Sequence, residues 1–291
     1  MKKSLLLASI MTAIMISPLG AVELRVGAGS YESDMKIKNF MSHDVENSIL
    51  TLTLKQRHQA LQESALFYYG DASYMTSSSR HSKTRFSNPV ADYRFSPRGS
   101  LNDITNRMVE MFPVDGDYET LGFDMNVGLG YDVWKKGESY IGVALNTGMT
   151  LPLISAKNIK SRIDFAYDLM QRWELDVTTY KIGPALLGNV ALDGGFSLFG
   201  MWSMGFQKGE VQSDLFHSGV DVKGGYSVFD VSARYQAKAS PFFFSAGFEK
   251  KDWSVDRVEV NLRNFFKFDA FSPFEMTLSS QVFYGSVGYR F

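Results

Sequence analysis

The sequence contains no cysteine, which excludes disulfides, a lipidated cysteine anchor, thiolate metal ligands and thiol catalysis. Histidine is also scarce, with 4 in 291 residues, and no His-x-x-x-His spacing occurs that could direct two imidazoles at one metal ion. Glycine-rich phosphate-binding loops are absent. The 30 basic and 31 acidic residues nearly cancel, which argues against a nucleic-acid-binding protein. We therefore expect no cofactor, no metal site and no nucleic-acid partner.

Long hydrophobic runs are absent too, apart from one near the N-terminus. Lys2 and Lys3 precede an apolar run over residues 5–16, which is followed by Pro18 and the small residues Gly20 and Ala21. This order is typical of a cleaved secretory signal peptide, and the run is shorter than the roughly 20 residues of a membrane-spanning helix. We assign residues 1–21 to a signal peptide and residues 22–291 to a single exported domain.

The rest of the chain shows hydrophobicity that alternates with a period of two. Between residues 121 and 133 every odd position is apolar, and every even position is glycine, aspartate or asparagine. The same division holds over residues 227–238, where apolar residues such as Phe229 alternate with Asp230, Arg234 and Lys238. A strand sends two such sets to opposite faces, whereas a helix would spread both around its circumference. One face is suited to hydrocarbon and the other to water.

Further segments repeat this pattern between turn residues. They cover residues 22–31, 48–55, 66–74, 140–149, 180–192, 196–206, 242–248 and 283–291. Most can reach the roughly 9–11 residues with which a tilted strand crosses a bilayer. Short connections at residues 56–62, 135–139, 193–195 and 239–241 alternate with longer ones at residues 32–46, 76–119, 152–172, 209–224 and 263–275.

This order of connections predicts an all-β fold: a closed antiparallel up-and-down transmembrane β-barrel of ten strands, within a range of eight to twelve. A tight turn at residues 249–252 would raise the number to twelve. Closure is required because an unpaired N–H or C=O in hydrocarbon costs several kcal/mol. The alternative fold is a secreted soluble β-sandwich, whose strands also alternate.

The C-terminal segment carries the most specific resemblance. Phe283, Val287, Tyr289 and Phe291 all fall on one set of alternate positions that ends at the last residue. A terminal phenylalanine with apolar residues at such positions resembles the C-terminal signature of bacterial outer-membrane β-barrel proteins. The resemblance implies a place in the outer membrane, contact with its lipid and lipopolysaccharide, and recognition by the barrel assembly machinery during insertion.

The inward-facing positions predict a polar lumen. They comprise Glu23, Arg25, Asp124, Asn126, Asp132, Lys181, Asp230, Arg234 and Lys238. Wide aqueous channels appear only at about 16–18 strands, so a ten-stranded lumen should be occupied mostly by side chains that pair with one another. The sequence accordingly predicts either a narrow porin-like channel or a structural barrel.

The longest connection is basic. Arg80, Lys83, Arg85, Arg94 and Arg98 stand in a stretch with few acidic residues, and they are candidate contacts for lipopolysaccharide or another anion. An adhesin or partner-binding barrel that acts through its loops is therefore the alternative function. Residues 100–111 and 157–173 each place apolar side chains on one helical face, which predicts short helices in these loops.

A ten-stranded barrel of this length also resembles the omptin proteases, whose sites include an aspartate and a histidine separated by one residue. No Asp-x-His sequence occurs in this chain. The four histidines do not define a catalytic triad, because nearness in sequence is not triad geometry. We therefore predict a protein without enzymatic activity.

Overall fold

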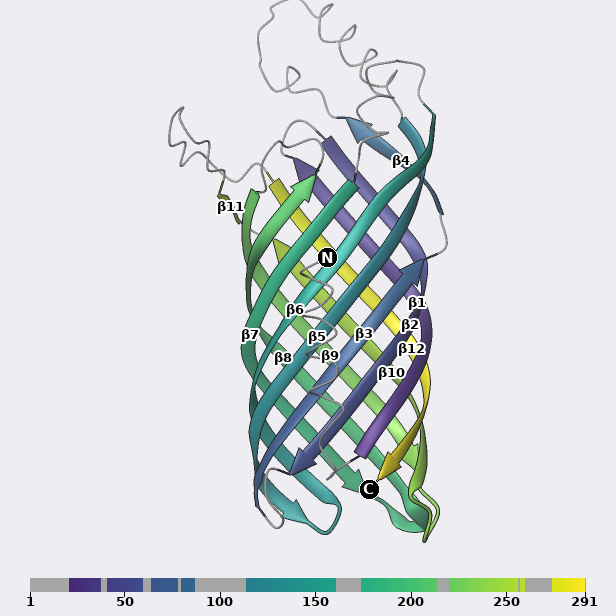
Figure 1. The fold of residues 1–291 in the computed structure, drawn as a ribbon, viewed down its shortest axis with the longest axis vertical. Helices are drawn as coiled ribbons and strands as arrows, with labels where there is room; N and C mark the ends of the chain where they lie inside the picture. The colour runs from purple at the N-terminus through teal and green to yellow at the C-terminus, as the bar shows by residue number, and fades with distance from the viewer. Residues whose placement is uncertain are drawn as a thin grey trace, which may run out of the picture.

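The computed structural model is a closed β-barrel in which every strand pairing is antiparallel (Figure 1). It describes residues 21–37, 41–59, 64–77, 80–86, 114–160, 174–213, 220–255, 257–259 and 274–290. The strands are β1 (Ala21–Ile37), β2 (Met41–Gln59), β3 (Leu66–Ser77), β4 (Arg80–Phe86), β5 (Val114–Lys136), β6 (Ser139–Lys160), β7 (Glu174–Ala191), β8 (Phe196–Ser213), β9 (Val220–Tyr235), β10 (Phe242–Val255), β11 (Arg257–Glu259) and β12 (Phe274–Arg290). A short 3-10 helix, η1 (Asp193–Gly195), joins β7 to β8.

The strands follow one another around the barrel in chain order, and β12 pairs with β1 to close it. Two of the twelve segments continue another strand. β4 pairs with β2 and β5, the neighbours of β3, and β11 pairs with β9, the neighbour of β10. The barrel therefore has ten strand positions, and the predicted closed ten-stranded fold is confirmed. The twelve-strand alternative is wrong, because residues 249–252 lie inside the unbroken strand β10.

The strands are longer than the periodic segments predicted. β1 runs to Ile37 and β2 starts at Met41, with these two residues paired, so most of the expected long loop at residues 32–46 is sheet. Residues 157–160 belong to β6 and not to a helix. The rest of that expected helix, and residues 100–111, lie outside the described residues. Ala21, the last residue of the predicted signal peptide, is the first described residue of β1 and pairs with Arg290.

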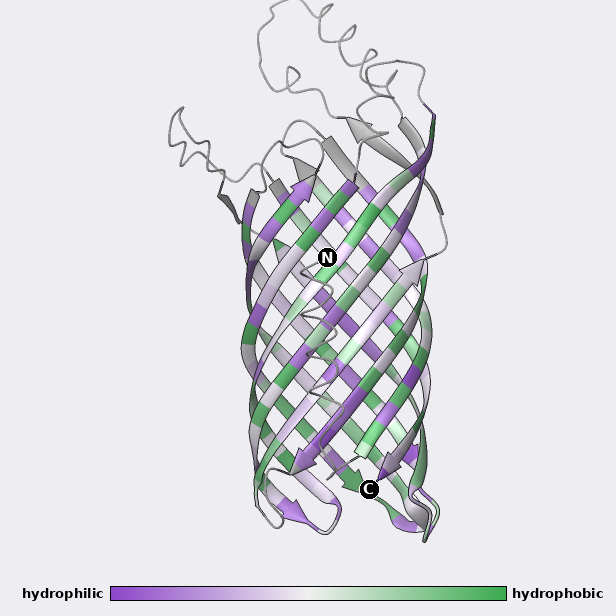
Figure 2. Ribbon diagram, viewed as in Figure 1, coloured by the Kyte–Doolittle hydropathy of each residue, from purple (hydrophilic) through white to green (hydrophobic). Residues whose placement is uncertain are grey.

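The two faces of the wall exchange polarity along strands such as β2. In the half of β2 that leads to Gln59, the exposed Leu52 alternates with the buried Lys55. In the half that starts at Met41, the exposed Glu46 lies between the buried Val45 and Asn47, and the buried Ile49 follows. Colouring by hydropathy shows polar and apolar residues in alternation along the strands (Figure 2). The outer face is therefore apolar near the short turns and polar toward the long connections.

Strand β7 shows the same exchange. Exposed Tyr180 and Ile182 border the buried Lys181, whereas exposed Glu174 precedes the buried Leu175 and Val177. The part of β7 around Lys181 therefore suits a lipid-facing surface over a polar interior. The part around Leu175 suits a water-facing surface over an apolar core. We call the end with the short turns, Ala21 of β1 and Arg290 of β12 the inner end, and the opposite end the outer end.

Aromatic side chains mark both limits of the apolar outer surface. The belt nearest the inner end includes exposed Tyr131, Trp134, Phe196, Tyr235, Phe242 and Tyr289, and the second belt includes exposed Tyr180, Phe206 and Phe283. Phe196 and Phe206 are about 33 Å apart along β8 at roughly 3.3 Å per residue, which a strand tilt of about 40° converts to a height of roughly 25 Å. This height matches the apolar band of outer-membrane barrels.

The part of the chain that the structure describes contains no helix of the length and hydropathy needed to cross a membrane.

Candidate functional site

A network of charged side chains crosses the interior nearer the inner end. Glu23 and Arg25 alternate on β1 and both point inward, with Arg25 Nε 2.9 Å from Glu23 Oε1. Arg25 Nη1 lies 2.8 Å from Asp230 Oδ2 of β9, and Lys55 Nζ lies 2.6 Å from the same oxygen. The hydroxyl of Tyr284 donates to Asp230 Oδ1 at 2.5 Å. Each buried charge in this network thus has a partner of opposite sign.

A second network centres on Asp124 of β5. Lys181 Nζ is 2.5 Å from Asp124 Oδ1, and Lys251 Nζ is 3.1 Å from Asp124 Oδ2. Lys251 also pairs with Glu249 at 2.9 Å. Asn126 donates an amide hydrogen to Asp71 Oδ1 at 2.8 Å. These residues come from β3, β5, β7 and β10, so the network ties together widely spaced parts of the wall.

The outer half of the interior is mostly apolar instead. We call this set the outer apolar cluster; it contains Tyr31, Met35, Val45, Ile49, Met75, Tyr118, Ile154, Ile159, Leu175, Val177, Val211, Val222, Tyr226, Val228, Trp253, Val255, Met276, Leu278 and Val282. These side chains are at most 8% exposed and come from strands around the barrel. They pack as the core of a soluble barrel would, which matches the polar outer face at the same height.

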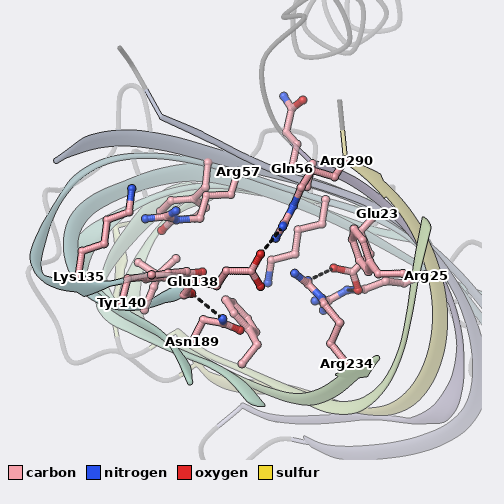
Figure 3. Close-up of a pocket in the computed structure, with 17 residues that line it drawn as sticks. Glu23, Arg25, Gln56, Arg57, Lys135, Glu138, Tyr140, Asn189, Arg234 and Arg290 are labelled. Carbon is pink, nitrogen blue, oxygen red and sulfur yellow. Dashed lines mark hydrogen bonds and ion pairs between the residues drawn. The ribbon is translucent and has the colours of Figure 1, made fainter. Parts of the chain in front are cut away.

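A cavity of about 420 Å³ lies at the inner end of the interior (Figure 3). Its lining comprises Ala21, Glu23, Arg25, Lys55, Gln56, Arg57, Tyr69, Lys135, Gly137, Glu138, Tyr140, Leu187, Asn189, Phe199, Arg234, Phe243 and Arg290. The β5–β6 turn contributes Gly137 and Glu138. Ala21, the first residue of β1, and Arg290, the last residue of β12, line it as well. The cavity therefore lies among the short turns and the inner ends of β1 and β12, and short turns face the periplasm in outer-membrane barrels.

Aromatic rings and acids position the arginines that line this cavity. Arg57 Nη2 lies 2.6 Å from Asp132 Oδ1, and its guanidinium carbon lies 3.9 Å from the centre of the Tyr140 ring. On the other side, Arg234 Nη2 lies 2.9 Å from Glu23 Oε2, and its guanidinium carbon lies 4.1 Å from the centre of the Phe243 ring. Figure 3 shows the two arginines on opposite sides of the cavity.

Glu138 reaches over the opening of the cavity from the β5–β6 turn. Arg290 Nη1 lies 2.7 Å from its carboxylate, and Asn189 donates an amide hydrogen to the Glu138 carbonyl at 2.9 Å. In Figure 3 the carboxylate lies between the side that carries Arg57 and the side that carries Arg234. The side chains of Arg290 and Glu138 are 44% and 61% exposed, so this pair is solvated, unlike the network beneath it.

The structure places all but one of the residues of the predicted lumen inside the barrel. Glu23, Arg25, Asp124, Asn126, Asp132, Lys181 and Asp230 are buried, and Arg234 is half-buried beside Glu23. Lys238 is different: β9 ends at Tyr235, and Lys238 is exposed in the turn before β10. The prediction that Lys238 lies in the lumen is wrong. The sequence keeps alternating between polar and apolar residues past Tyr235, although the strand ends there.

Sequence reasoning missed several partners of these residues. Lys55 and Tyr284 stand at inward-facing positions of segments that were identified, so the period of two alone could have found them. Arg57 falls in the predicted short connection at residues 56–62, and Lys251 falls in the alternative turn at residues 249–252. Cations at these positions became apparent only when the strands proved to extend beyond their apolar segments.

The other predicted contacts fall at the outer end or on the lipid face. Arg80, Lys83 and Arg85 lie on β4, while Arg94 and Arg98 lie outside the described residues. Phe283, Val287 and Tyr289 of the predicted assembly signal are exposed on the outer face of β12, and Phe291 is outside the described residues. Within the residues that the structure describes, no group of three or more His, Asp or Glu side chains is placed to hold a metal ion.

No protein-family model and no curated protein sequence matches the chain. Among solved structures, it is similar to the outer membrane protease OmpT from Escherichia coli, with a TM-score of 0.56 and 8% identity over 93% of this chain and 97% of that one. The translocator domain of autotransporter NalP from Neisseria meningitidis matches 100% of this chain and 95% of its own, with a TM-score of 0.36 and 14% identity. The likeness to OmpT shows the barrel fold. Together with the apolar band between the aromatic belts, this fold defines an outer-membrane β-barrel protein.

Proposed function

We propose that the protein is a closed, non-conducting outer-membrane barrel that acts as a binding protein through its outer end. The observation that carries this proposal is the filled interior. The outer apolar cluster occupies one half, and paired charges occupy much of the other. A barrel that worked as a porin would instead need a continuous path of water between its two ends.

The outer apolar cluster is the principal barrier to ions. Tyr31, Tyr118 and Trp253 are at most 3% exposed and project into the interior from β1, β5 and β10. Apolar constrictions exclude water and ions even where they are not completely occluded. Beneath them, the side chain of Lys181 is fully buried against Asp124, so it is not available to a passing solute. Both layers therefore favour a closed barrel.

The outer end provides a raised and charged surface. Outward-facing residues beyond the second aromatic belt are polar, among them Glu46, Glu174 and Gln212. Strand β4 adds Arg80, Lys83 and Arg85 at this end, paired through the backbone with β2 and β5. Guanidinium and ammonium groups bind phosphate through charge-assisted hydrogen bonds, so the phosphates of lipopolysaccharide are the partner that this strand suits.

Single-channel recording tests the closed barrel. Purified protein in planar bilayers should give no steady conductance steps, while a general diffusion porin measured in parallel should give them. A triple variant, Tyr31→Ala with Tyr118→Ala and Trp253→Ala, should produce conductance if these three side chains form the barrier. Regular steps from the unmodified protein would overturn the proposal in favour of a narrow channel.

Binding to lipopolysaccharide tests the role of β4. The variant Lys83→Gln with Arg85→Gln should bind lipopolysaccharide micelles about fivefold to thirtyfold more weakly in a direct titration, since each of the two lost ion pairs contributes roughly 0.5–1 kcal/mol. The variant Lys136→Gln with Lys238→Gln removes the same charge from the inner end and should bind normally. Equal affinity of both variants would remove β4 from the contact surface.

A further inference from the structure

We propose that the cavity at the inner end is a binding site for a small periplasmic anion that carries a carboxylate or phosphate group. The inference concerns the end opposite to the proposed binding surface, and it holds whether or not the barrel conducts. It rests on the sign of the charges that line the cavity, on hydrogen-bond donors there that have no partner, and on the size and position of the cavity.

Positive charge dominates the lining. The cationic residues are Arg25, Lys55, Arg57, Lys135, Arg234 and Arg290, whereas the acidic ones are Glu23 and Glu138. Pairing inside the barrel uses part of this charge, since Arg25 and Lys55 share Asp230 and Arg57 binds Asp132. Lys135 also adds its positive charge to the lining of the cavity. An anion entering from the periplasm therefore meets an attractive potential that the low-dielectric walls strengthen.

Arg25 carries one of these unpaired donors on an almost completely buried guanidinium group. Its side chain is 3% exposed, its Nε binds Glu23, and its Nη1 binds Asp230. The remaining nitrogen, Nη2, is buried and has no hydrogen-bond partner. Leaving a buried donor unpaired is unfavourable, and more so when the group is charged. An anionic oxygen in the cavity would supply the missing acceptor.

Two further arginines that line the cavity also carry donors without a partner. Arg57 Nε and Arg234 Nε are buried without partners, although the Nη2 atom of each arginine is bound to an acid. The Tyr140 and Phe243 rings stack against these guanidinium groups and limit their motion. Arginines held in this way lose little further freedom when they bind an oxyanion. Tyr69 adds a buried hydroxyl that also lacks a partner.

The dimensions favour a small molecule. A volume of about 420 Å³ lies at the lower end of the roughly 300–1,000 Å³ that ligand pockets occupy. Asn189 Oδ1 is a buried acceptor without a partner, so a hydroxyl group on the ligand could donate to it. A hydroxylated carboxylic acid such as citrate, or a phosphate, combines these features. Glu138 is the group that opposes an anion, because its carboxylate lies at the opening (Figure 3).

The test uses the full barrel, purified in a zwitterionic detergent, and calorimetric titration with inorganic phosphate and with citrate. At least one of these anions should bind saturably with one site per chain. Lys135→Gln should weaken binding about fivefold, because it removes one solvated charge from the lining. Lys136→Gln is the matched control: it neutralises the adjacent residue, which does not line the cavity, and should leave the affinity unchanged.

A variant that should bind the anion more tightly makes the test more specific. Glu138→Gln removes the carboxylate from the opening, so it should tighten binding of the same anion by about fivefold. Arg234→Lys keeps the charge that pairs with Glu23 but replaces the planar guanidinium, and it should weaken binding while the protein still migrates as a folded barrel in unheated electrophoresis. The proposal is overturned if neither anion binds saturably, or if Lys135→Gln and Lys136→Gln change the affinity equally.

Discussion

Arg25 of β1 and Asp230 of β9 join across the barrel, with Nη1 2.8 Å from Oδ2, although the two residues are 205 positions apart in sequence. Strands β12 and β10 lie between β1 and β9 in the wall, so this pair spans the interior and does not link neighbouring strands. Lys55 of β2 binds the same carboxylate from the other side of β1. Asp230 thus connects parts of the wall that share no backbone hydrogen bonds.

Replacing Asp230 should therefore destabilise the whole barrel. Asp230→Asn leaves Arg25 and Lys55 as buried cations short of a partner, and breaking a buried ion pair in this way costs about 3–5 kcal/mol. The free energy of unfolding, measured by urea titration of the refolded protein in lipid vesicles, should fall by this amount. Lys157→Gln breaks the exposed pair with Glu119 and should change the free energy by less than about 1 kcal/mol.

The limits of the lipid-facing surface can be located with single arginines. Val127 is exposed on β5 between the two aromatic belts, so Val127→Arg should cost about 2–4 kcal/mol in the unfolding free energy. Gln212 is exposed on β8 beyond the second belt, and Gln212→Arg should change it by no more than about 0.5 kcal/mol. Similar losses at both positions would contradict the boundary, because they would place both side chains in lipid.

A glycine on β8 lets that strand approach β7 closely. A Cβ atom on Gly205 would lie 2.2 Å from the carbonyl oxygen of Ile182, whereas a Cβ atom on Gly200 would have no atom within 4 Å. Gly205→Ala should destabilise the barrel by about 1–3 kcal/mol, because the backbone of β7 must move. Gly200→Ala, on the same strand, should leave the unfolding midpoint in urea unchanged or slightly raised. Equal effects of the two substitutions on stability would mean that β7 and β8 can move apart to accept a Cβ atom at Gly205.

The sequence was sufficient to predict the fold and much of the wall's polarity. Period-two alternation located a segment of every barrel strand, since lipid imposes a strong selection on each outward position between the aromatic belts. Where apolar residues are consecutive, the alternation does not show which of them faces lipid, and the structure does. Phe243 turns inward between the exposed Phe242 and Phe244, and Leu187 turns inward next to the exposed Leu186.

The outer half of the strands could not be predicted on the same basis. Beyond the second belt the outside is water, so the apolar residues occupy inward positions and the alternation changes phase. Residues 32–37 are an example: polar Glu32 and Asp34 face outward around the buried Met35 and Ser33, and together they read as a loop. Pairings such as Arg25 with Asp230 could not be predicted either, because they depend on which residues meet across the closed cylinder.

The outward continuation of the strands determines how far from the bilayer the loops are held. β7 continues for residues 174–179 beyond Tyr180, and at roughly 3.3 Å per residue and about 40° of tilt this lifts its end roughly 15 Å above the hydrocarbon. The outer end of β7 therefore lies well above the acyl chains. A soluble molecule could reach it without displacing any membrane lipid.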